Sequence, residues 1–178
     1  MWFFGFKLHM VTSTMGGSAL EFIVAPANCN DSPQFPKLLQ SLSEANVSFN
    51  FAVADAGYDS RPNYYAAIRH KAKPIIGFNR RGKPKGTTSR PLDRELTPRR
   101  NSKEWKQLFR SSRAAIERVN SVFKQQLGLR FLTLRGLPGA TIHASLGLII
   151  LLLINLVAHQ TGNPELLRSI EPWRYSNV

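Results

Sequence analysis

The chain has 178 residues, of which 43% are hydrophobic and 20% are charged, and its formal net charge is +13. This length suffices for one domain with its own core, and the composition excludes an intrinsically disordered chain. The single cysteine, Cys29, excludes a disulfide framework and is typical of a reducing compartment. A positive charge this large restricts the expected partners to nucleic acid, an anionic membrane surface or an acidic protein.

The first third of the chain predicts a hairpin and a helix. Residues 5–13 and 19–25 are rich in β-branched and aromatic side chains, and a double glycine separates them. This pattern is typical of two antiparallel strands joined by a turn. Asp31 and Ser32 precede Pro33, where a helix is expected to begin. Their side chains are predicted to cap that helix.

The middle of the chain alternates between strand and helix. Apolar residues at every second position predict a strand over 47–53 that ends at Asp55. Pro62 predicts the first turn of a helix over 63–70, and an apolar segment over 74–78 predicts a short buried strand. Strands that alternate with helices in this way indicate a mixed α/β sheet flanked by helices.

The excess positive charge lies in one stretch. Residues 80–135 contain 16 Lys and Arg against 4 Asp and Glu, whereas the rest of the chain contains 8 against 7. Such a run is either a solvated surface or the electrostatic footprint of a nucleic-acid-binding protein. Within it, residues 80–103 have almost no apolar side chains and predict a basic insertion.

Two helices are predicted for the C-terminal part. The first covers about 103–127 and ends at Gly128, with an apolar stripe at helical spacing. The second follows a turn at Pro138 and Gly139 and runs to about His159. Its apolar run of 14 residues, 145–158, is shorter than the roughly 20 residues that span a bilayer. We therefore expect a buried core helix rather than a membrane span.

Two carboxylates are candidates for chemistry. Asp55 follows a strand and precedes a glycine-containing turn, so it is either a functional group at a sheet edge or a turn-stabilising residue. Glu117 is predicted to share a helix face with Arg113 and Lys124. It is either half of a surface ion pair worth about 0.2–0.5 kcal/mol or a ligand for a hard divalent metal. The four histidines show no spacing typical of metal ligands.

These segments resemble one known family. The sequence ADAGYDS, which contains Asp55, resembles the second-aspartate motif of the DDE-type transposases of bacterial insertion sequences. The segments GFKLHMVTS and IVAPANCNDS resemble the strand and loop that precede this motif. Arg113, Glu117 and Lys124 match the Tyr-Arg-Glu-Lys signature of the family at its spacings. The resemblance extends from about Gly5 to Val157.

The resemblance implies an RNase H-like fold over residues 1–160, followed by a tail over 161–178. It also implies an enzyme of DNA transposition, which cleaves and rejoins phosphodiesters at transposon ends with two Mg²⁺ or Mn²⁺ ions. Asp55 and Glu117 would be the second and third carboxylates of its catalytic triad and would bind the metal. The basic residues expected to bind DNA are Arg80, Arg81, Lys83, Arg110, Arg113 and Lys124.

The implied partner is double-stranded DNA, and no membrane partner is expected. The implied location is the bacterial cytoplasm, in association with the nucleoid. A homodimer or a complementing N-terminal segment is a further expected partner. No Asp precedes Asp31 in this sequence. The family's first triad Asp is therefore absent, and the chain resembles the C-terminal portion of a catalytic domain that is incomplete at its N-terminus. Arg110 occupies the position of the family's Tyr, and Asp59 is the less favoured carboxylate, with a structural role in the turn.

Three alternatives to an active transposase remain open from the sequence. The first is a catalytically inactive transposase remnant that only binds DNA. The second is a small basic nucleic-acid-binding protein whose carboxylates are structural. The third is a protein anchored to a membrane by residues 145–158.

Overall fold

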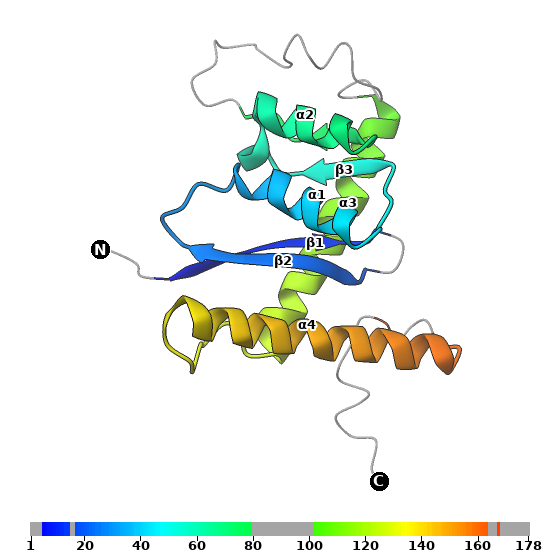
Figure 1. Ribbon diagram of the computed structural model, residues 1–178. Helices are drawn as coiled ribbons and strands as arrows, with labels where there is room; N and C mark the ends of the chain where they lie inside the picture. Colours follow the sequence, from blue (N-terminus) through cyan, green and yellow to red (C-terminus); the bar gives the residue numbers. More distant parts are fainter. Residues whose placement is uncertain (1–4, 15–16, 80–101, 164–166, 168–178) are drawn as a thin grey trace. The chain divides into compact units, whose positions relative to one another are not determined.

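The computed structural model describes residues 5–14, 17–79, 102–163 and 167. Its strands and helices are β1 (Phe6–Thr12), β2 (Ala19–Pro26), α1 (Gln34–Glu44), β3 (Phe51–Ala54), α2 (Arg61–Arg69), β4 (Lys73–Ile76), α3 (Lys103–Ser121) and α4 (Gly136–Gln160) (Figure 1). The mixed α/β composition is as predicted. The described strands, however, form two separate two-stranded sheets in place of one mixed sheet. The chain divides into a first unit, Met1–Cys29 with Ala114–Val178, and a second unit, Asn30–Arg113.

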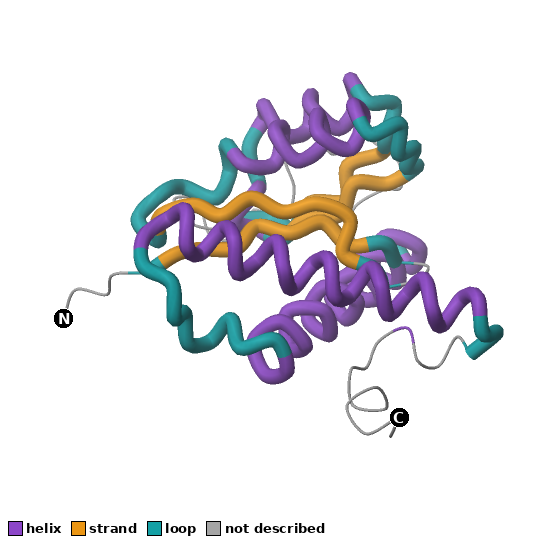
Figure 2. Tube along the Cα trace, turned by 60° about the horizontal axis from the view of Figure 1, so that its bottom comes forward, coloured by secondary structure: helices purple, strands orange, loops and turns teal. Residues whose placement is uncertain are grey.

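The first unit is built on the β1–β2 hairpin. The two strands are antiparallel, as predicted, with Phe6 opposite Pro26 and Val11 opposite Glu21. Helix α4 runs along this hairpin (Figures 1 and 2) and packs mainly against β2. The buried core between these elements consists of Ala19, Val119, Phe123 and Leu151.

Helix α3 changes its geometry before it reaches the predicted end. The α-helical hydrogen bonds stop at Ser121, and a π-helical turn covers Val122–Gln126. The predicted stop at Gly128 is confirmed, because this glycine has a φ of 73°, which is costly for residues with a side chain. The carbonyl of Leu127 lies 2.9 Å from Nε2 of His143, which gives it a partner at the end of the turn.

Helix α4 begins earlier than predicted. The expected turn at Pro138 and Gly139 is wrong, since both residues lie in the first turn of the helix. Proline is tolerated there because the first N–H groups of a helix have no partner within the helix. A Cβ on Gly139 would lie 2.8 Å from the backbone carbonyl carbon of Leu134, so this position tolerates no side chain.

The prediction that the apolar helix is a buried core helix holds for only one of its faces. The buried face contains small residues and two larger aliphatic residues: Gly139, Ala140, Ala144, Gly147, Leu151, Ile154 and Ala158. Other residues are exposed, among them Leu146 at 54% and Leu153 at 55%, because a two-stranded hairpin covers only one stripe of a helix. The helix has 25 residues, and a window of 18 of them has a mean hydropathy of 2.2, so α4 is long and apolar enough to cross a membrane, a criterion that core helices also meet.

The second unit contains a strand–helix–strand motif. Strands β3 and β4 are parallel, with Phe51 opposite Lys73 and Ala54 opposite Ile76. The strand expected over 47–53 begins only at Phe51. The core of this unit comprises Phe35, Leu39, Ala52, Tyr64, Ala66, Ala67, Ala72 and Ile76.

The predicted cap of α1 is wrong. The residue at the N-cap is Pro33, and no side chain caps the helix. Asp31 instead contributes its backbone carbonyl, which accepts a hydrogen bond of 3.0 Å from the N–H of Gln34.

The packing of α4 on α3 can be tested at Gly147. A Cβ at this position would lie 3.0 Å from Cε1 and 3.3 Å from Cδ1 of Phe123, a buried ring in the core. Gly147→Val should lower the free energy of unfolding by about 1–3 kcal/mol through overpacking, as measured by urea unfolding. The control is Leu146→Val at the exposed neighbouring position. Equal stability of the two variants would contradict this packing.

Candidate functional site

Asp55 stands at the carboxyl end of a parallel strand. Strand β3 ends at Ala54, and the carbonyl of Asp55 accepts a 3.0 Å hydrogen bond from the N–H of Tyr58, which closes a 3₁₀ turn over Ala56–Tyr58. The side chain of Asp55 is 58% exposed. In open α/β sheets, ligands bind in the crevice outside the carboxyl ends of the strands, so the position of Asp55 is typical of a functional group.

The end of β4 fixes the backbone that follows Asp55. The N–H of Gly77 donates to the carbonyl of Ala54 at 2.9 Å. A Cβ on Gly77 would lie 2.9 Å from the backbone N of Ala56 and 3.2 Å from Cζ of Phe109. Only glycine allows this approach. The turn that carries Asp55 is thus held between β4 and α3.

Helix α3 supplies a cation to Asp55. Nη1 of Arg113 lies 3.8 Å from Oδ1 of Asp55, and the Arg113 side chain is 51% exposed. An ion pair this accessible to water contributes about 0–1 kcal/mol to stability. The pair therefore places a positive charge beside the carboxylate without adding much to stability. The sequence predicted Arg113 on a face with Glu117, but it did not indicate the contact with Asp55.

A second carboxylate, Asp31, lies near the same turn. Its Oδ2 is 3.6 Å from the position that a Cβ of Gly57 would occupy. Burial, followed by the negative charges of Asp31 and Asp55, raises the pKa of Tyr58 to about 12. Tyr58 therefore keeps its proton at neutral pH and can donate a hydrogen bond beside the two carboxylates.

Hydrogen bonds hold the loop of Asp31 against the turn of Asp55. The hydroxyl oxygens of Ser32 and Ser60 are 2.8 Å apart. Nδ2 of Asn63 donates to the Ser32 hydroxyl at 3.0 Å and to the Tyr58 carbonyl at 2.8 Å. Asn63 is only 1% exposed. Sequence reasoning missed Asp31, because a contact between residues 31 and 57 leaves no trace in local spacing.

Asp59 occupies a different environment from Asp55. It is 8% exposed, and its carboxylate accepts hydrogen bonds from the Tyr64 hydroxyl at 3.2 Å and from the N–H of Asn79 at 2.8 Å. It thereby connects α2 to the segment after β4. This geometry suits a structural residue of the turn better than a metal ligand.

Of the remaining predicted site residues, three lie on or just after α3 and three lie outside the described residues. Arg110 and Glu117 are exposed on the helix, and Lys124 is exposed in the π-helical turn. Lys124 follows the end of the regular α-helix, so its position relative to Glu117 is set in part by the π-helical turn. The predicted DNA-binding residues Arg80, Arg81 and Lys83 lie outside the described residues.

The donor atoms are compatible with a hard divalent metal. Asp55 and Glu117 offer carboxylate oxygens, and Mg²⁺ is commonly held by one or two carboxylates together with substrate phosphates and water. Over 5–14, 17–79, 102–163 and 167, no group of three or more His, Cys, Asp or Glu residues could hold a metal ion by itself. Further ligands would therefore have to come from the substrate or from another segment.

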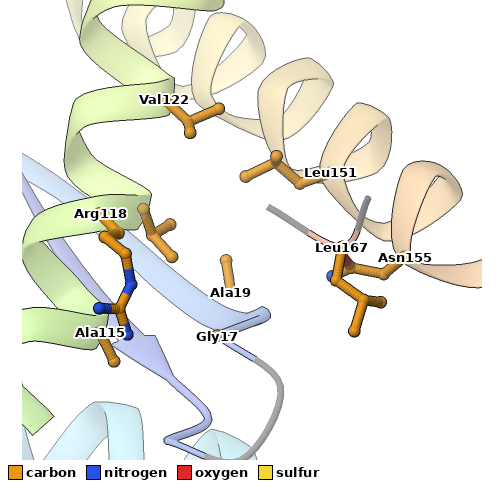
Figure 3. A pocket seen from close by; sticks show the side chains of 9 residues that line it. Gly17, Ala19, Ala115, Arg118, Val122, Leu151, Asn155 and Leu167 are labelled. Carbon is orange, nitrogen blue, oxygen red and sulfur yellow. The ribbon is translucent and has the colours of Figure 1, made fainter. Parts of the chain in front are cut away.

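A small cavity in the first unit has a different character. It is lined by Gly17, Ala19, Ala115, Arg118, Val119, Val122, Leu151, Asn155 and Leu167 (Figure 3). Its volume of about 20 Å³ accommodates about one water molecule. Nδ2 of Asn155 donates to the Ser18 hydroxyl at 2.7 Å. Because no carboxylate lines the cavity, we assign it to packing and not to catalysis.

The close approach at Gly77 predicts a cost for any side chain. Gly77→Ala should lower the free energy of unfolding by about 1–3 kcal/mol, since the neighbouring atom is backbone and cannot rotate away. Gly5→Ala is the control, because no atom lies within 4 Å of its Cβ position. Chemical denaturation of both variants measures the difference. If Gly77→Ala is as stable as Gly5→Ala, the backbone contact is not present.

The raised pKa of Tyr58 predicts a loss of stability in alkali. The pKa in the unfolded chain is near 10, against about 12 in the folded chain. Between these values the unfolded chain releases the proton and the folded chain retains it, so the free energy of unfolding falls as pH rises. Tyr58→Phe should remove this contribution. Denaturation curves for both proteins between about pH 9 and 12 test it, and identical pH dependences would refute it.

Comparisons with known proteins identify a family for most of the chain. The family described as the transposase DDE domain matches residues 1–153, a segment that includes the Asp55 turn, Arg113 and Glu117. No curated protein and no solved structure gives a significant match. The matched segment covers most of the 178 residues, and the chain belongs to the transposase DDE domain family.

Proposed function

We propose that this chain acts in DNA transposition. It binds double-stranded DNA at transposon ends and takes part in the metal-dependent cleavage and strand transfer of phosphodiesters. The observation that carries the proposal is the family match over residues 1–153. The exposed Asp55 carboxylate, paired with Arg113 at 3.8 Å, supports it.

Asp55 and Glu117 are proposed as the metal-binding carboxylates. Bound Mg²⁺ or Mn²⁺ ions would stabilise the attacking and leaving oxygens of an in-line displacement at phosphorus. Arg113 orients the carboxylate of Asp55 and offers its guanidinium, whose planar donors match phosphate oxygens. Lys124 and Arg110 are proposed to bind neighbouring phosphates. The basic residues Arg80, Arg81 and Lys83 are proposed to add to the DNA contacts.

The proposed organisation is an RNase H-like catalytic domain over residues 1–160, with a basic insertion at about 80–103 and a tail over 161–178. The antiparallel hairpin and the parallel β3–β4 pair are compatible with this fold. We place the protein in the bacterial cytoplasm, associated with the nucleoid, where its partner DNA lies.

We propose that a complementing segment supplies the first triad carboxylate, because a second copy of this chain carries the same sequence. No Asp precedes Asp31 in the sequence, and the described residues contain no group of three metal ligands. Among the described strands, each has one hydrogen-bonded neighbour. Strand edges of this kind accept further strands readily, which gives a complementing segment a place to bind.

A second candidate function is DNA binding without cleavage. The incomplete set of ligands within the described residues favours it, as does the concentration of 16 Lys and Arg in residues 80–135. In this case the chain is a transposase remnant that holds DNA and does not cut it.

Nicking of a supercoiled DNA circle in Mg²⁺ or Mn²⁺ separates the two candidates. The purified chain, supplied with a segment that carries the first triad Asp, should nick the DNA, and Asp55→Asn and Glu117→Gln should each abolish nicking while DNA affinity changes little. Glu44→Gln removes a carboxylate from α1 and serves as the control, with activity close to that of the original chain. Salt-sensitive binding without nicking supports the second candidate. Nicking that persists in both site variants refutes the assigned roles.

A further inference from the structure

Four basic residues of α3 lie along one side of the helix. At about 100° per residue they fall within a sector of about 80°, and all four are exposed and belong to the second unit: Lys103, Lys106, Arg110 and Arg113. We refer to this set as the α3 basic row. Arg113 ends the row and is the residue that contacts Asp55.

The row is purely cationic. Glu104 is the one acidic residue of the sequence between Lys103 and Arg113, and it projects about 140° from the centre of the row. In the part of the chain that the structure describes, Arg113 pairs with Asp55, and no ion pair involves the other three residues of the row. Their charges are therefore available to an external anion.

Packing does not require these side chains. The aromatic residues of the same segment, Trp105 and Phe109, lie outside the sector of the row, about 80° and 40° from Arg113, and stack with ring centroids 4.7 Å apart. Phe109 is the one that reaches Gly77 at the end of β4. One side of α3 thus packs the aromatic pair, while another presents only cations to solvent.

We propose that the α3 basic row binds successive phosphates of one DNA strand and directs that strand to Asp55. This inference rests on the proposed function and adds Lys103 and Lys106 to the residues that bind DNA. A rise of about 1.5 Å per residue gives the row a length of about 15 Å. DNA has one phosphate per about 3.4 Å of axis on each strand. Four cations therefore face about four phosphates where the strand runs beside the helix.

The shape of the row favours DNA over the other anionic partners. A helix that binds a lipid surface needs apolar side chains next to its basic ones, to enter the acyl region. No apolar side chain lies between the cations of the α3 basic row. The row is a line of cations that ends beside the carboxylate of Asp55. This arrangement suits DNA, a linear polyanion in which one phosphodiester is cleaved.

The test measures the salt dependence of affinity for a short DNA duplex with the full chain. The double variant Lys103→Gln with Lys106→Gln should reduce the slope of log affinity against log salt by about 1.8, at about 0.9 per phosphate contact. The matched control, Lys37→Gln with Arg69→Gln, removes the same charge from exposed positions on α1 and α2. Its slope should equal that of the original chain. Lys103→Arg with Lys106→Arg should retain the full slope.

Three outcomes would overturn the proposal: an unchanged slope in the Lys103 and Lys106 double variant, an equal loss in the control, or tighter binding to duplex RNA than to DNA. Circular dichroism verifies that the helix is intact, as expected because Lys and Gln have similar helix propensities. If the slope falls in the double variant but nicking persists in Asp55→Asn, the α3 basic row binds DNA and the proposed catalytic role of Asp55 is refuted. If the slope is unchanged in the double variant and nicking requires Asp55, only DNA binding by the α3 basic row is refuted.

Discussion

The parallel pairing of β3 with β4 is the constraint on which the candidate site depends. It carries Ala54 and Gly77 to adjacent positions, where the N–H of Gly77 donates to the Ala54 carbonyl at 2.9 Å. Because Gly77 has no side chain, its backbone also approaches the N of Ala56. The residue between Ala54 and Ala56 is Asp55, so its backbone is fixed on both sides while its carboxylate remains in water.

Exposed side chains are usually mobile. At this site, backbone contacts on both sides of Asp55 fix its main chain while its carboxylate stays exposed. The ion pair between Arg113 and Asp55 is too accessible to water to stabilise the fold by more than about 1 kcal/mol. The buried amide of Asn63 and the buried carboxylate of Asp59 hold the surrounding turn through hydrogen bonds. A carboxylate that is held by such contacts and remains accessible is suited to bind a metal ion.

The sequence predicted the elements well where the signal is local. Period-two and period-3.6 patterns located the hairpin, the β3–α2–β4 motif and α3, and the helix stop at Gly128 followed from the tolerance of glycine for positive φ. Predictions failed where distant residues decide the outcome. Pro138 and Gly139 suggested a turn but lie in the first turn of α4. The hairpin covers one stripe of α4, so apolarity alone did not predict how much of the helix is buried.

The site was predictable only in part, for the same reason. Spacing and resemblance selected Asp55, Arg113 and Glu117, but the contact of Arg113 with Asp55 and the approach of Asp31 depend on tertiary packing. The π-helical turn that contains Lys124 was also not predicted, because regular spacing presupposes an unbroken α-helix.

The most direct test of the account is the binding of Mn²⁺ to the full chain, followed by electron paramagnetic resonance of the free ion. We expect binding that strengthens when duplex DNA is added, because phosphate oxygens complete the coordination. Asp55→Asn should weaken this binding at least tenfold, the change that removing one ionised ligand typically produces at roughly 1.4 kcal/mol or more. Equal Mn²⁺ affinity in the chain and in Asp55→Asn, with and without DNA, would contradict the assignment of the Asp55 turn as a metal-binding site.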